Sequence, residues 1–241
     1  MNVLLIGATS EIASAVAEIY AKAGANLFLT GRNPEALENL QKHLGVLGAS
    51  AVQTGALDLN KLDSHDALLQ NAKLALGNID IIFIAPGILP ADDFSLDEQL
   101  EAFSTNCNAT LALAEKSGNL LAEQGKGSLS VISSVAGDRG RQSNYWYGAA
   151  KGAVTIFCEG LMNRLYKSGV SVTVIKPGFI DTAMTENFEK GPLWAKPHDI
   201  APLITRAIEK RKFVAYTPGF WWFIMFIIRN IPNFIFKRMS L

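Results

Sequence analysis

The sequence predicts an α/β protein in which helices cover both faces of a doubly wound parallel sheet, in three layers. Short apolar runs alternate with longer amphipathic stretches along most of the 241 residues. These runs lack the polar alternation of a half-exposed sheet, as expected for parallel strands that are covered on both faces. With 49% hydrophobic residues the chain can bury a large core, and we expect one undivided domain followed by an apolar tail.

Seven strands are expected, each a short apolar run bounded by turn residues. Pro34 and Pro197 suit the first turns of helices, and Gly24 and Gly169 suit helix ends. Right-handed crossovers between such strands place ligands beyond the carboxyl ends of the strands. The strands are expected at residues 1–6, 26–30, 50–54, 79–85, 128–133, 171–175 and 213–216.

The chain opens with a strand, a glycine turn and a helix. Gly7-Ala8-Thr9-Ser10-Glu11-Ile12-Ala13 follows the first strand directly. Because a helix N-terminus offers free N–H groups and the positive end of a dipole, this order predicts a nucleotide-phosphate site of the Rossmann type. Glu11 is read as an acid that the dipole favours in the first helical turn. We expect Thr9 and Ser10 to offer hydroxyls to the phosphates.

Tyr147 and Lys151 lie four residues apart in a predicted helix, so their side chains share one face. A free tyrosine has a pKa of about 10, and a nearby cation lowers that pKa. Tyrosine then becomes usable as a general acid or base. Ser134 ends the strand before this helix and is expected to face the same cleft, which favours a catalytic interpretation over an aromatic ring packed under a solvated lysine.

In their order and spacing these motifs resemble the short-chain dehydrogenase/reductase family, over roughly residues 1–216. The upstream asparagine of that family matches Asn106. The resemblance implies that Ser134 binds the substrate oxygen and that Tyr147 delivers its proton. It also implies that Lys151 lowers the pKa of Tyr147 and binds the nicotinamide ribose, while Asn106 anchors a water-linked proton relay. Hydride then comes from the cofactor.

The resemblance also assigns cofactor contacts, with departures. Asp58 matches an aspartate that contacts adenine, and Thr182 matches a threonine that holds the nicotinamide carboxamide. Of the usual TGxxxGIG glycines only Gly7 remains, and Pro86 stands where the family has an N–H donor. The residues expected to bind the cofactor are Gly7, Thr9, Ser10, Ile12, Arg32, Asp58, Leu59, Ala85, Gly87, Tyr147, Lys151, Pro177, Gly178, Ile180 and Thr182.

The cofactor type is read from Gly31-Arg32, at the end of the second strand. An acid there would bind the ribose hydroxyls of NAD. Arginine suits a 2′-phosphate because its planar fork matches the oxygens bidentately. We therefore expect NADP(H), with carbonyl reduction as the physiological direction. The alternative is that Arg32 is a solvated loop cation.

Charge and cysteine content argue against several other classes of protein. The 22 basic and 22 acidic residues give a formal net charge of +0, which indicates no nucleic-acid partner. Cys107 and Cys158 have no paired spacing and no histidine cluster beside them, so we expect free thiols and no metal. The amino terminus begins with a core strand, which leaves no room for a signal peptide and predicts a cytoplasmic domain.

Residues 218–241 form the apolar tail, after a catalytic domain of residues 1–217. The tail runs apolar from Phe220 until Arg229, and is too short to span a bilayer, which needs about 20 apolar residues. Its aromatic residues and flanking cations favour a segment in the membrane interface, which would hold the protein peripherally on the inner face. The alternatives are a tail that packs a subunit interface or covers its own active site.

Within the family, the glycine turn and the tail look most similar to reductases that act on decaprenylphosphoryl-2-keto-ribose. The expected function is thus an NADP(H)-dependent oxidoreductase for a carbonyl or alcohol that is hydrophobic or lipid-linked, for example a keto-sugar on a polyprenyl phosphate. A 3-oxoacyl or steroid-like carbonyl reductase is the first alternative. A non-catalytic dinucleotide-binding sensor or scaffold is the second, and the intact set of Asn106, Ser134, Tyr147 and Lys151 argues against it. We expect a homo-oligomer, either a dimer or a tetramer.

Two segments near the expected site leave their roles open. Asp138, Arg139 and Arg141 precede the catalytic tyrosine, and they could contact a polar substrate or form an ordinary charged loop. Residues 181–196 are expected to cover the substrate, with Phe188 and Trp194 as candidate lining.

Overall fold

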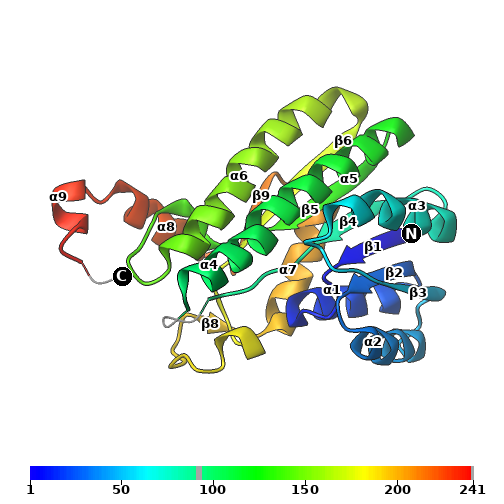
Figure 1. Cartoon of the computed structure of the whole chain (residues 1–241), viewed down its shortest axis with the longest axis horizontal. Helices are drawn as coiled ribbons and strands as arrows, with labels where there is room; N and C mark the ends of the chain where they lie inside the picture. The colour runs from blue at the N-terminus through cyan, green and yellow to red at the C-terminus, as the bar shows by residue number, and fades with distance from the viewer. Residues whose placement is uncertain (91–93, 240–241) are drawn as a thin grey trace.

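The computed structural model describes residues 1–90 and 94–239, and its main sheet is parallel throughout (Figure 1). The strand order is β3-β2-β1-β4-β5-β6-β9. Because the order reverses beside β1, the sheet is doubly wound, which confirms the predicted fold class. The strands are β1 (Asn2–Ile6), β2 (Asn26–Gly31), β3 (Ala51–Ala56), β4 (Ile81–Ile84), β5 (Gly127–Ile132), β6 (Val170–Pro177) and β9 (Val214–Thr217).

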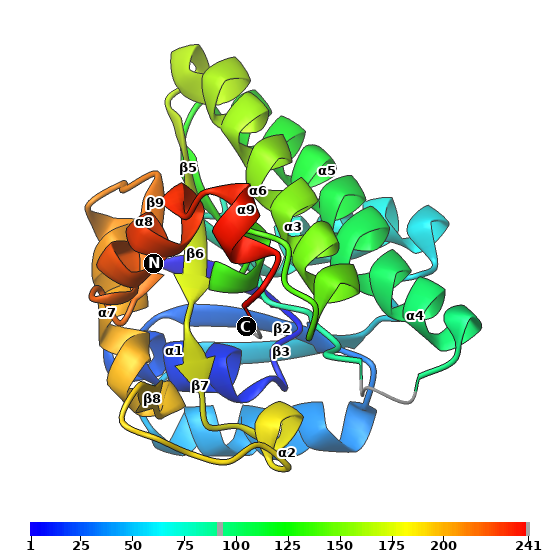
Figure 2. The same cartoon turned by 90° about the vertical axis from the view of Figure 1, so that its left-hand side faces the viewer.

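Helices cover both faces of this sheet (Figures 1 and 2). Alternate residues of β1 show why this central strand is apolar on both of its faces. Val3 and Leu5 belong to the core cluster under one helical layer, whereas Leu4 and Ile6 belong to the cluster under the other. One layer holds α1 (Glu11–Lys22), α2 (Pro34–Val46) and α7 (Pro197–Glu209), and the other holds α3 (His65–Leu76), α4 (Leu96–Phe103), α5 (Thr110–Gln124) and α6 (Tyr145–Leu165).

A π-helical segment, Ser104–Ala109, joins α4 to α5. Such segments are rare and are frequently found at functional sites. This one carries Asn106, which is only 1% exposed. The irregularity therefore coincides with a residue that the sequence assigns to catalysis.

A second, two-stranded sheet lies beyond the end of β6. It pairs β7 (Phe179–Ile180) with β8 (Trp194–Ala195) in parallel. The chain between them contains a short helical turn, Ala183–Thr185, and an exposed loop. Residues 181–196, which are expected to cover the substrate, thus form an excursion from the chain that this small pairing closes.

The tail forms α8 (Trp221–Asn230) and α9 (Asn233–Phe236), and the two sides of α8 differ sharply. Trp221 and Met225 are 2% and 0% exposed and pack against Val135, in the turn after β5. A Cβ atom on Gly178 would lie 1.8 Å from Trp221 Nε1, so the indole fills the space that a side chain at position 178 would need. By contrast, Trp222 is 57% exposed.

The inner side of the tail is therefore part of the domain core. The sequence favoured a membrane interface as the cover for the aromatic residues of the tail. For Trp221 the cover is the domain itself. Phe220, Trp222 and Phe223 remain exposed.

Arg139 makes a second set of contacts that hold the tail against the domain. Its guanidinium donates to the carbonyl oxygens of Ile228 and Ile231, at 2.5 and 2.7 Å, and to Asn233 Oδ1 at 3.0 Å. Its Cζ atom lies 3.7 Å from the centroid of the Phe236 ring, a cation–π contact. Within residues 1–90 and 94–239, no helix has the length and hydrophobicity that crossing a bilayer requires.

Candidate active site

A cleft with a volume of about 460 Å³ opens at the carboxyl ends of the strands, where a doubly wound sheet binds ligands. It brings together three of the four expected catalytic residues and most of the expected cofactor contacts. Asn106, Gly7, Thr9, Arg32, Asp58 and Leu59 are not in its lining. The expected site residues that do line it are Ser10, Ile12, Ala85, Gly87, Ser134, Tyr147, Lys151, Pro177, Gly178, Ile180 and Thr182.

Helix α6 approaches the turn Val135–Asp138 through direct contact between backbones. A Cβ atom on Gly137 would lie 2.6 Å from the carbonyl carbon of Lys151, and one on Gly148 would lie 2.9 Å from the oxygen of Ala136. Gly152 faces the oxygen of Gly137 in the same way, at 3.1 Å. Because these glycines have no side chains, the start of α6 lies directly beside the end of β5. This contact places Tyr147 next to Ser134.

Ser134 lines the same cleft as Tyr147. Its Oγ atom accepts from the backbone N–H of Ala136 at 3.1 Å, which leaves the hydroxyl proton free to donate. Burial raises the pKa of Tyr147 to about 12, and the hydrogen bond from Ser134 opposes that rise. The predicted lowering of the tyrosine pKa by Lys151 is therefore wrong, because burial dominates. Tyr147 is a protonated donor at neutral pH.

Lys151 is 1% exposed, so its ammonium must find partners inside the protein. Nζ donates to the carbonyl oxygen of Ile132 at 3.1 Å and to that of Pro86 at 3.4 Å, which links the ends of β5 and β4. Burial lowers the pKa of Lys151 to about 8. Nζ lies 5.7 Å from the centroid of the Tyr147 ring, so the cation flanks the ring.

Asn106 lies behind this group. Its Oδ1 accepts from the backbone N–H of Ile88 at 2.9 Å, and its Nδ2 donates to the carbonyl oxygen of the same residue at 2.6 Å. This double hydrogen bond fixes the loop that follows β4. A Cβ atom on Gly87 would lie 3.6 Å from Asn106 Oδ1 and 3.8 Å from Lys151 Nζ. The side chains of the asparagine and the lysine therefore both lie close to this glycine.

The glycine turn after β1 is built for a close backbone approach. Gly7 has φ +76°, and a Cβ atom there would lie 2.9 Å from the nitrogen of Pro86. Ser10 caps α1, because its hydroxyl oxygen accepts from the N–H of Ala13 at 3.3 Å. Its proton is left to donate to an anion, as the sequence predicts. The N-terminus of α1 therefore faces the cleft with a helix dipole and a hydroxyl, which fits a dinucleotide pyrophosphate.

Glu11 has a partner that the sequence does not reveal. The residue lies in the first turn of α1, as predicted, and its Oε1 accepts from the backbone N–H of Ala183 at 2.6 Å. This hydrogen bond joins the phosphate end of the cleft to the turn Ala183–Thr185. Residues 181–196, the segment expected to cover the substrate, are called the covering segment below. A carboxylate beside the expected pyrophosphate site therefore anchors this segment.

Two further expected cofactor contacts lie at the adenosine end. Arg32 is exposed at the end of β2, directly before Asn33, the N-cap of α2. Asp58 follows β3, and its Oδ1 accepts from the backbone N–H of Asn60 at 3.1 Å. Both side chains lie at the carboxyl edge of the sheet, outside the lining of the cleft itself.

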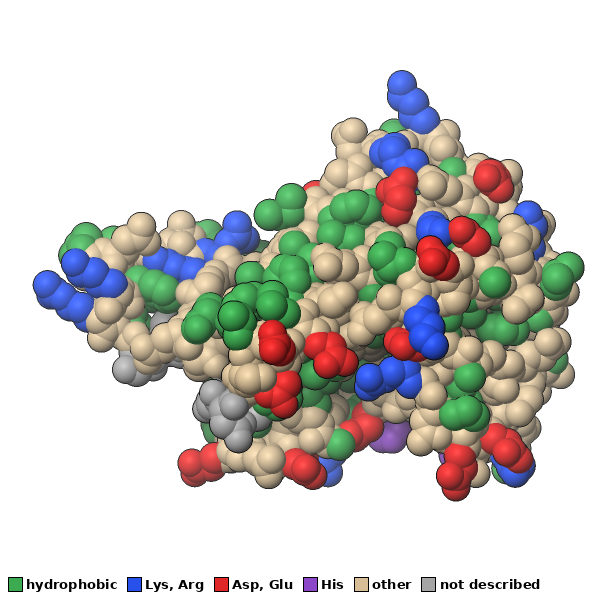
Figure 3. Space-filling view, in the orientation of Figure 1, with side chains coloured by type: hydrophobic (Ala, Val, Ile, Leu, Met, Phe, Trp, Pro, Cys, Tyr) green, Lys and Arg blue, Asp and Glu red, His purple; other side chains and the backbone are tan. Residues whose placement is uncertain are grey.

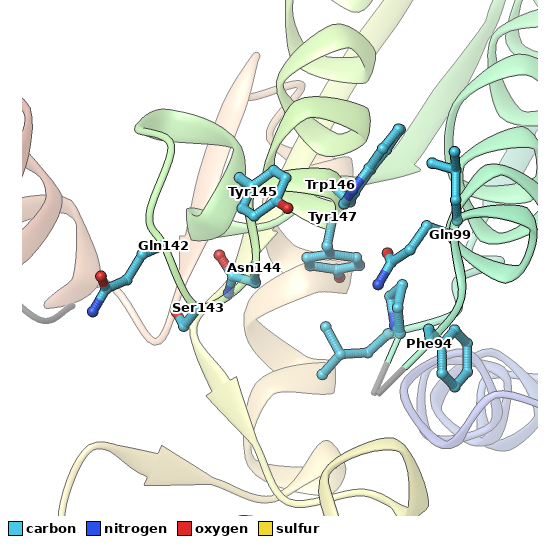
Figure 4. Close-up of a pocket in the computed structure, with 11 residues that line it drawn as sticks. Phe94, Gln99, Gln142, Ser143, Asn144, Tyr145, Trp146 and Tyr147 are labelled. Atoms are coloured by element: carbon cyan, nitrogen blue, oxygen red, sulfur yellow. The ribbon is translucent and has the colours of Figure 1, made fainter. Parts of the chain in front are cut away.

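A second cavity, of about 330 Å³, adjoins the cleft and shares Tyr147 with it (Figure 4). Phe94 and Gln99 face Tyr147 and Trp146 across this space. Apolar side chains also line the main cleft, where Phe188 and Trp194 come from the covering segment. Tyr147 therefore lines two adjoining, partly apolar cavities.

Asp138, Arg139 and Arg141, the charged residues of the loop before α6, each make different contacts. Asp138 is buried and pairs with Lys176, and it accepts a hydrogen bond from the hydroxyl of Tyr216 at 2.7 Å. Burial raises the pKa of Tyr216, and its bond to Asp138 adds to the rise. Arg139 holds the tail, as described above. Arg141 alone lines the cleft.

Comparison with known proteins decides the family. A family model described as short chain dehydrogenase matches residues 1–192. The chain belongs to the short-chain dehydrogenase family. It is 33% identical over 243 residues to an uncharacterized oxidoreductase of Mycobacterium tuberculosis H37Rv, with 98% of this chain and 96% of the relative covered. It is 32% identical to an uncharacterized oxidoreductase of Streptomyces coelicolor, with 99% and 95% covered.

Solved structures agree with this short-chain dehydrogenase fold. A short-chain type dehydrogenase/reductase from Mycobacterium ulcerans superposes with a TM-score of 0.81 at 21% identity, over 95% of both chains. A variant of actinorhodin polyketide ketoreductase with NADPH gives 0.77 at 22% identity, over 89% of this chain and 94% of that one. As a short-chain dehydrogenase the protein is an oxidoreductase that uses a nicotinamide cofactor.

The position of Glu11 predicts that its charge weakens dinucleotide binding. In a Glu11→Gln variant the amide oxygen can still accept from Ala183, but the repulsion of a pyrophosphate is lost. At about 1 kcal/mol for charges about 4 Å apart in water, we expect NADH and NADPH to bind about fivefold more tightly. Titration of cofactor fluorescence measures this, with Glu123→Gln on α5 as the control for net charge. Unchanged or weaker binding in Glu11→Gln would contradict the expectation.

Proposed function

We propose that the protein is an NADP(H)-dependent oxidoreductase that interconverts a carbonyl and an alcohol on a hydrophobic or lipid-linked substrate. The observation that carries the proposal is that Ser134, Tyr147 and Lys151 line one cleft, with Lys151 only 1% exposed. The three groups come from the end of β5 and the first two turns of α6. This is the geometry of a proton donor held against the position of a reacting oxygen.

The roles of the residues follow from their hydrogen bonds. Ser134 and Tyr147 would bind the oxygen of the substrate carbonyl, and the tyrosine hydroxyl would supply its proton during reduction. Lys151 would favour the phenolate that remains, because its ammonium lies beside the ring. Its lowered pKa makes it able to give up a proton in turn. Asn106 would hold the loop after β4 in position for this exchange.

The residues of the cleft fit a nicotinamide dinucleotide. The Gly7 turn and the N-terminus of α1 would hold the pyrophosphate, and Pro177, Gly178 and Thr182 would flank the nicotinamide. When bound, the nicotinamide supplies or accepts a hydride. Arg32 would bind the 2′-phosphate of NADP, because it is exposed at the end of β2 where an acid would select NAD.

The surface of the tail favours a substrate that resides in a membrane. On α8, Trp222, Phe223 and Phe226 are each more than half exposed, while the opposite side of the helix packs into the domain. Lys237 and Arg238 follow on the same projecting end, where Figure 3 shows basic and apolar side chains together. An interface of anionic lipid would cover the aromatic residues and attract the cations.

This surface is near the covering segment of the cleft. In Figures 1 and 2, α8 and α9 lie at the same end of the molecule as β7 and β8. A protein attached through the tail would therefore direct the cleft mouth toward the lipid that carries its substrate. The placement we propose is peripheral, on the cytoplasmic face of the membrane.

Replacing Tyr147 by phenylalanine removes the proton donor and little else. We expect turnover of carbonyl substrates with NADPH to fall by at least about 100-fold, within the range for general acid catalysis. NADPH fluorescence should still report binding close to that of the unmodified protein. Tyr145→Phe is a matched control, since Tyr145 is 61% exposed on the same turn of α6. Retained activity in Tyr147→Phe would make the pair of residues structural.

The cofactor preference depends on Arg32. We expect NADPH to bind more tightly than NADH, and Arg32→Ala to weaken NADPH binding by about 10- to 100-fold, the worth of a hydrogen bond to a charged group. NADH affinity should not change. Arg164→Ala is the control, because Arg164 pairs with Glu115 on the far helices α5 and α6. Equal affinities for NADH and NADPH in the unmodified protein would refute the assignment.

Membrane attachment should depend on the outer side of α8. We expect the full-length protein to float with vesicles of phosphatidylcholine and phosphatidylglycerol. The combined changes Trp222→Ser, Phe223→Ser and Phe226→Ser should reduce this binding more than tenfold, because each buried aromatic side chain contributes about 1.5–3 kcal/mol. Substituting the exposed Val46 and Leu74 by serine removes apolar surface elsewhere and should have no effect.

Point substitutions are preferable here to truncation at residue 218, which would also remove the buried Trp221. Failure of the unmodified protein to bind vesicles would refute membrane attachment. A change of oligomeric mass in the serine variant, without vesicle binding by either protein, would assign the surface to a subunit interface.

A further inference from the structure

Arg141 is the one charged residue of its loop that has no partner in the part of the chain described. Asp138 is neutralised by Lys176, and Arg139 is bound to the tail. Neither an ion pair nor a side-chain hydrogen bond of residues 1–90 and 94–239 involves Arg141, and its Nε is buried without an acceptor. The side chain lines the same cleft as Ser134 and Tyr147.

A partly buried guanidinium without a counter-charge is unfavourable, because it loses water and gains nothing in return. Burial lowers the pKa of Arg141, although arginine stays charged at neutral pH. The acids that line the cleft do not compensate it. Glu11 binds Ala183, and Glu189 is exposed on the covering loop, with no ion pair to Arg141.

A second polar atom of this loop is also unsatisfied. Asn144 Oδ1 is buried without a donor among the described residues. In Figure 4, Asn144 lies beside Tyr147, at the cavity that adjoins the cleft. Met184, Phe188 and Trp194 also line the cleft and provide apolar surface. The site thus combines a cation, a polar atom and a hydrophobic surface around one reacting position.

We propose that Arg141 binds an anionic group, a phosphate or a carboxylate, on the same molecule as the reacting carbonyl, while Phe188 and Trp194 take its apolar part. Arginine suits either anion, because its planar fork donates two parallel hydrogen bonds. Arg141 then determines specificity and takes no part in proton transfer. That the ligand is the substrate rests on the function proposed above, whereas the anion site itself does not.

Binding can be measured without turnover. Protein saturated with NADP⁺ is titrated calorimetrically with hexyl phosphate, hexanoate and hexan-1-ol, which share a chain and differ in charge. We expect at least one anion to bind at least about tenfold more tightly than the alcohol, and Arg141→Gln to abolish that difference. Arg141→Lys should retain part of it, because the charge remains without the fork. Arg164→Gln, at a remote surface arginine, should behave like the unmodified protein.

The same variants separate the possible outcomes. Equal binding of anions and alcohol to the unmodified protein, or anion binding that persists in Arg141→Gln, would overturn the proposal. Weaker NADP⁺ binding in Arg141→Gln, with unchanged discrimination among the hexyl compounds, would assign Arg141 to the cofactor and also overturn it. The stronger of the phosphate and carboxylate arms identifies the anion.

Activity gives an independent readout. With NADPH and a keto acid compared with its methyl ester, Arg141→Gln should raise KM for the acid alone by about 10- to 100-fold and leave kcat unchanged. If no carbonyl compound is reduced while Arg141-dependent anion binding persists, the proposed function fails and the anion site stands.

Discussion

The direct backbone contact between α6 and the turn after β5 is the constraint on which the site depends. Gly137 and Gly148 leave no side chain between the two elements, so the helix starts against the end of the strand. The hydroxyls of Ser134 and Tyr147 come within hydrogen-bonding reach only because of this approach. The same approach buries Lys151, whose ammonium is then stabilised by carbonyl oxygens at the ends of β4 and β5. The positions of the two hydroxyls and the burial of the ammonium therefore have the same structural cause.

The sequence predicted those parts of the structure that local pattern determines. Each of the seven expected strands is present. A strand buried on both faces, such as β1, is apolar along most of its length, whereas β3 at the edge of the sheet is largely exposed. Motifs at strand ends were placed correctly at one edge of the sheet, since parallel strands bring their carboxyl ends together. Ser134 and Lys151 could be found from the sequence because the number of residues between them is set by the path from the end of a strand to the next helix.

Contacts between distant segments could not be predicted. Glu11 binds a backbone N–H that is 172 positions away, and backbone groups carry no signature in the sequence. The burial of Trp221 but not Trp222 depends on the direction in which α8 leaves the sheet, which composition does not encode. The pKa of Tyr147 was misjudged for a related reason. Proximity of a lysine in the sequence says nothing about how deeply the ring is buried.

The turn Val135–Asp138 and the loop after it connect features that the sequence treats separately. Val135 packs against Trp221 of the tail, Arg139 binds the tail backbone, and Ser134 immediately precedes the turn. The exposed aromatic side of α8 and the cleft residue Ser134 are thus supported by neighbouring residues. Whatever binds the outer side of α8 acts on a helix that also packs against the turn beside Ser134.

The π-helical segment that carries Asn106 resembles an α-helix into which one extra residue has been inserted. A π turn holds one more residue than an α turn, and each residue of an α-helix rotates the chain by about 100°. Removing one position from Ser104–Ala109 would let α4 and α5 merge into one regular helix, while turning the asparagine away from Ile88. Regular helix geometry and the orientation of this side chain therefore oppose each other. Stability alone would favour the regular helix, whereas the π turn gives Asn106 its two hydrogen bonds to Ile88.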